Sequence, residues 1–236
     1  MTNEFRVMTS GAFTAAYLEL IPKIKNLTKK SIFTASTSMG SGESSILNRL
    51  LQGEVVDIII VAEAALNKLV DAGLVLKESH SVVAYSTIGI AVSEGAPKPD
   101  IGSIDALKRT LLKAKTIAYS ASVSGQYVTT ELYQRLGVAD ELMSKSILIS
   151  GGERVGSAIA RGDAEIGFQQ ISELLPVPGI AHITQLPPEV QKVSKIYACV
   201  ATSCADADLA RSVILFLASP QAAESIAKSG LEPVGI

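Results

Sequence analysis

The sequence has few of the residues that build disulfide and metal sites. Its 236 residues include two cysteines, Cys199 and Cys204, and two histidines, His80 and His182. Two cysteines are too few for a disulfide framework, and their spacing matches no common zinc-binding pattern. The histidines are about a hundred residues apart, which nearly excludes a metal site built on histidine. We expect neither a metal nor a cofactor.

An excess of positive charge and long apolar runs are also missing. Lys and Arg number 21 against 23 Asp and Glu, for a net charge of −2, so no basic field is present to attract nucleic acid. The longest apolar runs, such as residues 58–62, have the length of a strand, and we expect no membrane insertion. The first residues show no signal-peptide pattern. As written, the sequence indicates a cytoplasmic protein, or a periplasmic one if a signal peptide was removed.

Strand-like and helix-like segments alternate along the whole chain. Hydrophobic residues make up 47% of the sequence, and the alternation predicts an α/β fold with a parallel sheet covered by helices on both faces. The two halves share a plan in which a strand leads through a Ser/Gly loop into a helix. We predict two lobes, residues 1–84 plus 196–236 and residues 85–195, with a ligand cleft between them.

Three junctions between a strand and a helix are rich in small polar residues: Thr9-Ser10-Gly11, residues 36–42 and residues 120–125. Free backbone N–H groups and the helix dipole favour an anion at such a place, and hydroxyl groups add neutral donors. Serine capping of a helix explains any one junction. Three junctions spread over both halves favour a cleft for a small anion. Residues 40–45 lack the spacing and the lysine of a nucleotide-binding P-loop.

One arginine and two glutamines add candidate ligand contacts. Arg154 stands at a predicted helix start, where the dipole disfavours positive charge, so it is a candidate for gripping a carboxylate. The alternative is a surface arginine paired with Glu153 or another acid. Gln169 and Gln170 follow a strand predicted over residues 164–168. Their amides can donate to an oxyanion, or they can cap the following segment.

Signals for catalysis are weak. Neither histidine lies near a G-x-S-x-G nucleophile motif, and the two cysteines fit small core side chains better than nucleophiles. Glu43 is the one acidic residue within a proposed site motif, which makes it the candidate general base. The alternative is an acid in the first turn of a helix, where it favours the dipole.

The order of these motifs resembles the molybdate-binding solute receptors of ABC importers. The resemblance covers essentially the whole chain and rests on Ser10-Gly11, Ser36–Met39, Gly53-Glu54-Val55-Val56-Asp57 and Arg161–Phe168. It is closer to a subgroup that includes aconitate isomerase, through Met8–Gly11, Ser38–Gly40, Phe168–Gly179 and Pro187–Gln191. The resemblance implies the type-2 periplasmic-binding-protein (Venus flytrap) fold, in which two lobes close on an oxyanion held by neutral donors.

The resemblance also implies positions for the ligand contacts. They fall on Ser10, on Thr37 or Ser38, on Ser122 or Ser124, and near Arg154 or Val155. With their neighbours, the candidate ligand-binding residues are Thr9, Ser10, Gly11, Thr37, Ser38, Met39, Ser122, Ser124, Gly125, Arg154, Gln169 and Gln170. Where the molybdate receptors have a tyrosine, this chain has glutamine at about Gln170. That difference, together with Arg154, fits a carboxylate better than molybdate.

Two functions remain open from the sequence. The first is a monomeric binding protein for a small oxyanion or organic carboxylate, with an ABC permease as its partner. The second is a cofactor-independent isomerase that shifts a proton on an unsaturated tricarboxylate, as the resemblance to aconitate isomerase implies. Such an enzyme needs a general base within reach of the substrate carbon. Glu43 is the candidate, with Tyr85 or Tyr127 as less favoured substitutes.

Overall fold

The computed structural model describes residues 3–35, 43 and 45–235. It divides into two compact units: unit 1 comprises Met1–Ser86 and Ser194–Ile236, and unit 2 comprises Thr87–Val193. Two long strands lie at the division. Strand β4 (Ser81–Ser93) runs across it, and β9 (Val193–Val200) begins on the last residue of unit 2. The chain therefore passes between the units in extended segments.

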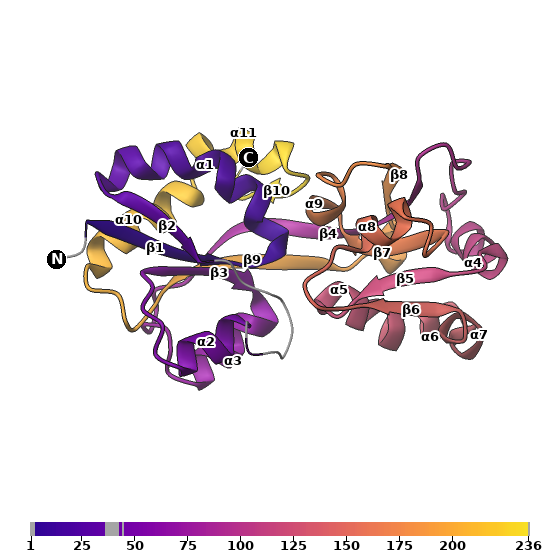
Figure 1. The fold of residues 1–236 in the computed structure, drawn as a ribbon, viewed down its shortest axis with the longest axis horizontal. Coiled ribbons are helices and arrows are strands. Elements are labelled where there is room, and N and C mark those ends of the chain that lie inside the picture. The colour runs from indigo at the N-terminus through magenta and orange to yellow at the C-terminus, as the bar shows by residue number, and fades with distance from the viewer. Residues whose placement is uncertain (1–2, 36–42, 44, 236) are drawn as a thin grey trace. The chain divides into compact units, whose positions relative to one another are not determined.

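Unit 1 is a twisted sheet with helices on both faces (Figure 1). Besides parts of β4 and β9, its elements are β1 (Glu4–Thr9), α1 (Gly11–Thr28), β2 (Ser31–Ala35), α2 (Ile46–Leu51), β3 (Ile58–Ala62), α3 (Glu63–Asp71), α10 (Ala207–Leu217), α11 (Pro220–Lys228) and β10 (Glu232–Pro233). The strand order is β2-β1-β3-β9-β4, and β10 pairs with β4. Strand β1 is parallel to β2 and β3.

Alternating side chains of the unit 1 strands fill two cores. Val7 packs in the core beneath α1, α10 and α11, whereas Met8, the next residue, packs in the core beneath α2 and α3. Every residue of β3 is buried, which explains why Ile58–Ala62 reads as an unbroken apolar run. The carboxyl ends of β1 and β3 emerge side by side, since Thr9 is in register with Ile60. Ser10 and Glu63, which follow these strands, therefore lie at one edge of the sheet.

Unit 2 repeats this plan with shorter elements (Figure 1). They are α4 (Ile104–Lys113), β5 (Ile117–Ser120), α5 (Val123–Tyr127), a π-helical segment (Val128–Leu132), α6 (Tyr133–Arg135), α7 (Ala139–Met143), β6 (Ser146–Ile149), α8 (Val155–Ala160), β7 (Ile166–Gln170), α9 (Ile171–Leu174), β8 (Ile180–Gln185) and a 3-10 turn (Pro188–Val190). The strand order is β4-β7-β5-β6, with β8 also on β4. Helices α4–α7 share one core, and α8 and α9 share the other.

The two long strands depart from the predicted parallel sheet. Strand β9 is antiparallel to β3, and β4 is antiparallel to β7 and β8. A buried apolar run looks the same in either direction, so its sequence does not reveal this.

Several predicted boundaries also shift. The helix predicted from Glu43 begins at Ile46, and the strand predicted to end at Phe168 continues to Gln170. The short helix α7 was not predicted, because so short a helix shows no hydrophobic periodicity. No helix in the part of the chain that the structure describes is long and apolar enough to span a membrane.

Candidate functional site

Ser10 directly follows β1 and is the N-cap residue of α1, which has 18 residues. Its side chain is 2% exposed, and its Oγ has no hydrogen-bond partner among the described residues. Its backbone is fixed, because its N–H donates to the Ile60 carbonyl at 2.8 Å. A buried hydroxyl without a partner is costly to the fold. An anion at this helix start would accept its hydrogen bond and meet the positive end of the helix dipole.

The neighbours of Ser10 have separate roles. Thr9 is 5% exposed, and its hydroxyl donates to the Ser10 carbonyl at 3.2 Å. Gly11 is the first residue of α1. Both predicted residues therefore flank the Ser10 hydroxyl, at the edge of the sheet where the strands end.

The second predicted junction falls largely outside the described residues, and with it Thr37, Ser38 and Met39. Glu43 lies in a turn and is exposed. The interpretation of Glu43 as a first-turn acid is wrong, because α2 begins at Ile46. Ser45 caps this helix, accepting a hydrogen bond from the Asn48 N–H at 3.3 Å. Whether Glu43 acts as a base stays a prediction.

The third junction brings three serine hydroxyls together. Ser120 Oγ lies 2.7 Å from Ser122 Oγ and 3.2 Å from Ser124 Oγ, and the last two are 3.2 Å apart. Ser124 is fully buried and Ser120 is 5% exposed. These hydroxyls can turn toward an anion only by giving up hydrogen bonds to each other. Ser120 was not among the predicted contacts, although its place at the end of a strand was visible.

Gly125 has a packing role at this junction. It lies within α5 rather than in the loop before it, and a Cβ atom there would approach the Ser120 carbonyl oxygen to 1.7 Å. Only glycine allows the first turn of α5 to press against the end of β5. A side chain at this position would therefore displace α5 from Ser120.

Arg154 is the N-cap residue of α8 and is half-buried. The alternative of a pair with Glu153 is wrong, because Glu153 forms an ion pair with Arg161. Within the described ranges, no carboxylate lies at ion-pair distance from the Arg154 guanidinium. A guanidinium of this kind can donate two hydrogen bonds to one carboxylate.

Gln169 and Gln170 end β7, so their side chains point to opposite faces of the sheet. Gln169 is engaged by the protein, because its Oε1 accepts the Val155 N–H at 2.8 Å. Gln170 is 5% exposed and pairs in register with Ile88 on β4. Gln170 is the N-cap residue of α9, but its side chain does not cap that helix. Donation by these amides to an oxyanion stays a prediction.

Sequence reasoning missed Glu173, a buried acid in α9. It is 8% exposed, and burial raises the pKa of its carboxyl group to about 7. The charge of Arg154 and a hydrogen bond from the Gln169 side chain oppose this rise. Ser172, beside it, is 1% exposed, and its Oγ is unpartnered among the described residues. The available signal was an acid inside the apolar run Ile171–Leu175, directly after a strand.

The cysteines offer no nucleophile. Cys199 lies in the core of unit 1, and burial raises the pKa of its thiol to about 12. Burial likewise raises the pKa of the Cys204 thiol to about 11. Both thiols therefore stay protonated at neutral pH. The described part of the chain holds no cluster of three or more His, Cys, Asp or Glu side chains placed to bind a metal.

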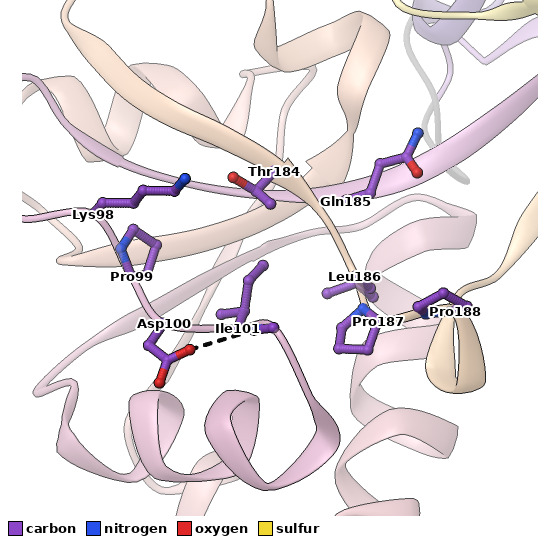
Figure 2. Close-up of a pocket in the computed structure, with 10 residues that line it drawn as sticks. Lys98, Pro99, Asp100, Ile101, Thr184, Gln185, Leu186, Pro187 and Pro188 are labelled. Atoms are coloured by element: carbon purple, nitrogen blue, oxygen red, sulfur yellow. Dashed lines mark hydrogen bonds between the residues drawn. The ribbon is translucent and has the colours of Figure 1, made fainter.

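A hollow of about 520 Å³ lies elsewhere in unit 2. Figure 2 shows Pro99, Asp100 and Ile101 on one side of it and Leu186 and Pro187 across from them. None of the predicted site residues lines this hollow. The Gly102 N–H donates a hydrogen bond to Asp100 Oδ1 at 3.4 Å. The hollow is therefore separate from the Ser120–Arg154 region.

Comparison with known proteins settles the family. A model of the family described as "Bacterial extracellular solute-binding protein" matches residues 5–232. The chain belongs to this family. Its fold is that of the type-2 periplasmic-binding proteins, as the resemblance to molybdate receptors implied, and that resemblance is confirmed.

Two curated members of the wider group resemble this solute-binding protein over most of its length. An aconitate isomerase from Pseudomonas sp. is 39% identical over 229 residues, which is 97% of this chain and 87% of the relative. The molybdate-binding protein ModA of Rhodobacter capsulatus is 25% identical over 223 residues, or 93% of this chain and 86% of that protein. The relatives thus include both a receptor and an enzyme.

A solved structure supports the fold independently. The periplasmic molybdate-binding protein of Azotobacter vinelandii superposes with a TM-score of 0.74 at 18% identity. The match covers 96% of this chain and 98% of that one. At this identity the likeness concerns the fold of the solute-binding protein and not its ligand.

Proposed function

We propose that this solute-binding protein binds a small organic polycarboxylate. The observation that carries the proposal is Arg154, a half-buried guanidinium without an ion-pair partner in the described structure, at the start of α8. Neutral hydroxyl groups alone suit a tetrahedral oxyanion. A guanidinium adds a planar pair of donors that matches a carboxylate.

Ser10 supports an anion subsite in unit 1. Its buried, unpartnered hydroxyl at a long helix start needs an acceptor. The resemblance to molybdate receptors implies that one ligand contacts both lobes. We propose the same here, with Ser10 and the Ser122–Arg154 region contributing to one ligand.

A thermal-shift panel tests the ligand class, with molybdate, tungstate, sulfate, succinate, citrate and trans-aconitate as probes. We expect the tricarboxylates to raise the melting temperature most and molybdate to leave it nearly unchanged. Calorimetry on Ser10→Ala and Arg154→Ala then shows whether both units contact the same ligand. Tighter binding of molybdate or tungstate than of any carboxylate would contradict the proposal.

The proposed partner and location follow from the family. We propose that the protein is a periplasmic monomer that delivers its ligand to an ABC permease, and the extracellular description of the family supports this over a cytoplasmic location. Cell fractionation checks the location, and light scattering checks the monomer. Co-purification with a membrane permease in the presence of ligand checks the partner.

A second candidate function is isomerisation of aconitate, favoured by the relative of that name at 39% identity. Glu43 remains one candidate base. Glu63 is another, because it lies at the same sheet edge as Ser10, and the Tyr197 hydroxyl donates to its carboxylate at 3.1 Å. This hydrogen bond orients the carboxylate, as an acid–base residue requires.

Interconversion of trans- and cis-aconitate, followed by proton NMR, decides between receptor and enzyme. If the protein is an isomerase, Glu43→Gln or Glu63→Gln lowers turnover at least ~100-fold and leaves binding within about tenfold, as expected for loss of one proton-transfer group. If the wild-type protein binds aconitate without interconverting its isomers, the receptor stands and the isomerase is excluded.

A further inference from the structure

We propose that Gln191 is a positioning residue for the hinge, because its side chain ties together the two chain segments that cross between the units. The chain crosses once within β4, between Ser86 and Thr87, and once at the start of β9, between Val193 and Ser194. The resemblance to molybdate receptors implies lobes that close on a ligand, and the crossing segments are where such a motion bends the chain. The inference rests on this fold and not on the proposed carboxylate.

The side-chain amide of Gln191 bonds to the backbone of Ile88 through both of its polar atoms. The Ile88 N–H donates to Gln191 Oε1 at 3.0 Å, and Gln191 Nε2 donates to the Ile88 carbonyl at 3.0 Å. Ile88 is the second residue of unit 2 on β4, and Gln191 stands two residues before Val193, where unit 2 ends. Two hydrogen bonds therefore join the two crossing segments within unit 2, directly beside the division.

These bonds occupy the edge of β4 at the point where β8 ends. The pairing of β8 with β4 reaches the pair Gln185 and Gly89, and Ile88 is the next residue of β4. The N–H and the C=O of one strand residue point to the same edge of the strand, so the Gln191 amide takes the place of a paired strand residue. Ile88 is fully buried, where a backbone N–H without a partner would be costly.

The turn that precedes Gln191 is also bonded to unit 2. The hydroxyl of Tyr127, a buried side chain of α5, donates to the Val190 carbonyl at 2.7 Å. Arg135 of α6 donates to the Glu189 carbonyl at 2.6 Å. Three consecutive residues, 189–191, are therefore each held by a side-chain hydrogen bond within unit 2.

The chain becomes exposed directly after this anchored segment. Residues 192, 193 and 195 are exposed, and Ile196 is the first fully buried residue of β9. Exposed strand residues have few packing contacts that oppose a change in backbone angles. We therefore place the bending segment of β9 at residues 193–195, immediately after the Gln191 anchor. With the anchor in place, the two crossing segments cannot move apart on the unit 2 side.

Distances between two spin labels, measured by pulsed electron paramagnetic resonance, test the anchor without any ligand. The labels are attached to Lys25→Cys in unit 1 and Lys113→Cys in unit 2, both exposed positions, with Cys204→Ser as background; the other cysteine is buried. We expect Gln191→Met to broaden the distribution of label distances, because each crossing segment can then bend separately. Gln134→Met is the matched control, since this glutamine of α6 is exposed, and it should leave the distribution unchanged. An equally narrow distribution in Gln191→Met would overturn the proposal.

Gln191→Glu separates the two hydrogen bonds from other effects of substitution. A protonated carboxyl group has one donor and one acceptor, as the amide has toward Ile88, whereas a carboxylate cannot donate to the Ile88 carbonyl. The ordinary pKa of a glutamate is about 4.3. We expect the distance distribution of this variant to match that of the wild-type side chain at pH 4 and to be broader at pH 8. The same width relative to wild type at both pH values would overturn the role of these bonds.

Hydrogen exchange shows whether the effect is local. In Gln191→Met, the Ile88 amide should exchange at least about tenfold faster than in wild type, because its hydrogen-bond acceptor is gone. Amides of β7, which pairs with the other edge of β4, should keep their rates. An unchanged rate at Ile88, or equal acceleration throughout unit 2, would overturn the proposal. None of these measurements contains a ligand, so they decide the role of Gln191 whether or not a carboxylate binds.

Discussion

In unit 1 the candidate site is a neutral hydroxyl at the start of a long helix, whereas in unit 2 it combines charge with hydroxyls. Ser10 has a buried Oγ without a partner in the described structure. In unit 2, Ser120, Ser122 and Ser124 bond to one another, and the half-buried Arg154 stands at the start of α8. Both candidate sites follow a strand, but the groups that could donate hydrogen bonds to an anion differ between them.

This difference between the two units suggests that unit 1 contributes affinity for anions in general and that unit 2 selects which anion binds. A neutral donor at a helix start favours any small anion, because it recognises charge without a fixed geometry. A guanidinium favours a planar carboxylate, because its paired N–H groups match the two carboxylate oxygens. We therefore expect changes in unit 1 to weaken all anions alike and changes in unit 2 to alter which anion binds.

The largest expected effect comes from Arg154→Ala. Loss of a hydrogen-bonded charge partner costs about 2–4 kcal/mol, which corresponds to about 30- to 1,000-fold weaker binding of citrate or trans-aconitate. Sulfate should be much less affected. Isothermal calorimetry measures both, and Arg161→Ala is the control, since its ion pairs are on the surface. Equal tricarboxylate binding by the mutant would show that Arg154 is structural.

Glu173→Gln should change how stability depends on pH. Folding raises the pKa of Glu173 from 4.5 to about 7, so the folded state binds the proton more tightly than the unfolded state does. The resulting stability is complete below pH 4.5 and is lost as the pH rises through 7. The loss amounts to about 3 kcal/mol.

Urea unfolding at pH 4.5 and pH 8 measures this loss for wild type and for Glu173→Gln. The glutamine does not titrate, so the variant should lose about 3 kcal/mol less than wild type over the interval. Glu153→Gln should follow wild type. Parallel curves for wild type and Glu173→Gln would show that the acid does not titrate in this range.

Gly125→Ala tests the packing that holds the unit 2 serines. Its Cβ would lie 1.7 Å from the Ser120 carbonyl oxygen, so α5 must shift, at a cost of about 1–3 kcal/mol. Gly102→Ala is the control in the same unit, since its nearest neighbour would be 3.9 Å away. Thermal unfolding compares the two variants. A stable Gly125→Ala protein with unchanged ligand affinity would contradict this role.

Ser10→Ala has the smallest expected effect. Loss of one neutral hydrogen bond costs about 1 kcal/mol, so every anion that binds should bind about five-fold more weakly. Without ligand, the variant should be at least as stable as wild type, because a buried hydroxyl without a partner is removed. Ser45→Ala is the contrast, since that hydroxyl caps α2 and its loss costs about 1 kcal/mol. Selective loss of one anion in Ser10→Ala would contradict the comparison.

Much of the fold could be predicted from the sequence, because burial of strands and helices leaves a local pattern. The run Ile58–Ala62 and the periodic face of α1 both appear as apolar residues at the expected spacing. The Ser10 and Ser122–Gly125 junctions were visible because small polar residues stand where a strand turns into a helix. The order of these motifs also determined the family, since it persists where the identity of individual residues is low.

The tertiary structure decided the direction of β4 and β9 and the partners of the buried polar groups. Whether a strand is parallel or antiparallel depends on which strand pairs with it in the sheet. The apolar sequence of a buried strand is the same in both cases. Helices α8 and α9, which carry Val155 and Glu173, lie in one core only because both pack against β7. Gln169, at the end of β7, accepts the Val155 N–H and so ties that strand to the start of α8. Burial, which raises the pKa of Glu173, is a property of that packing, and no local sequence pattern specifies it.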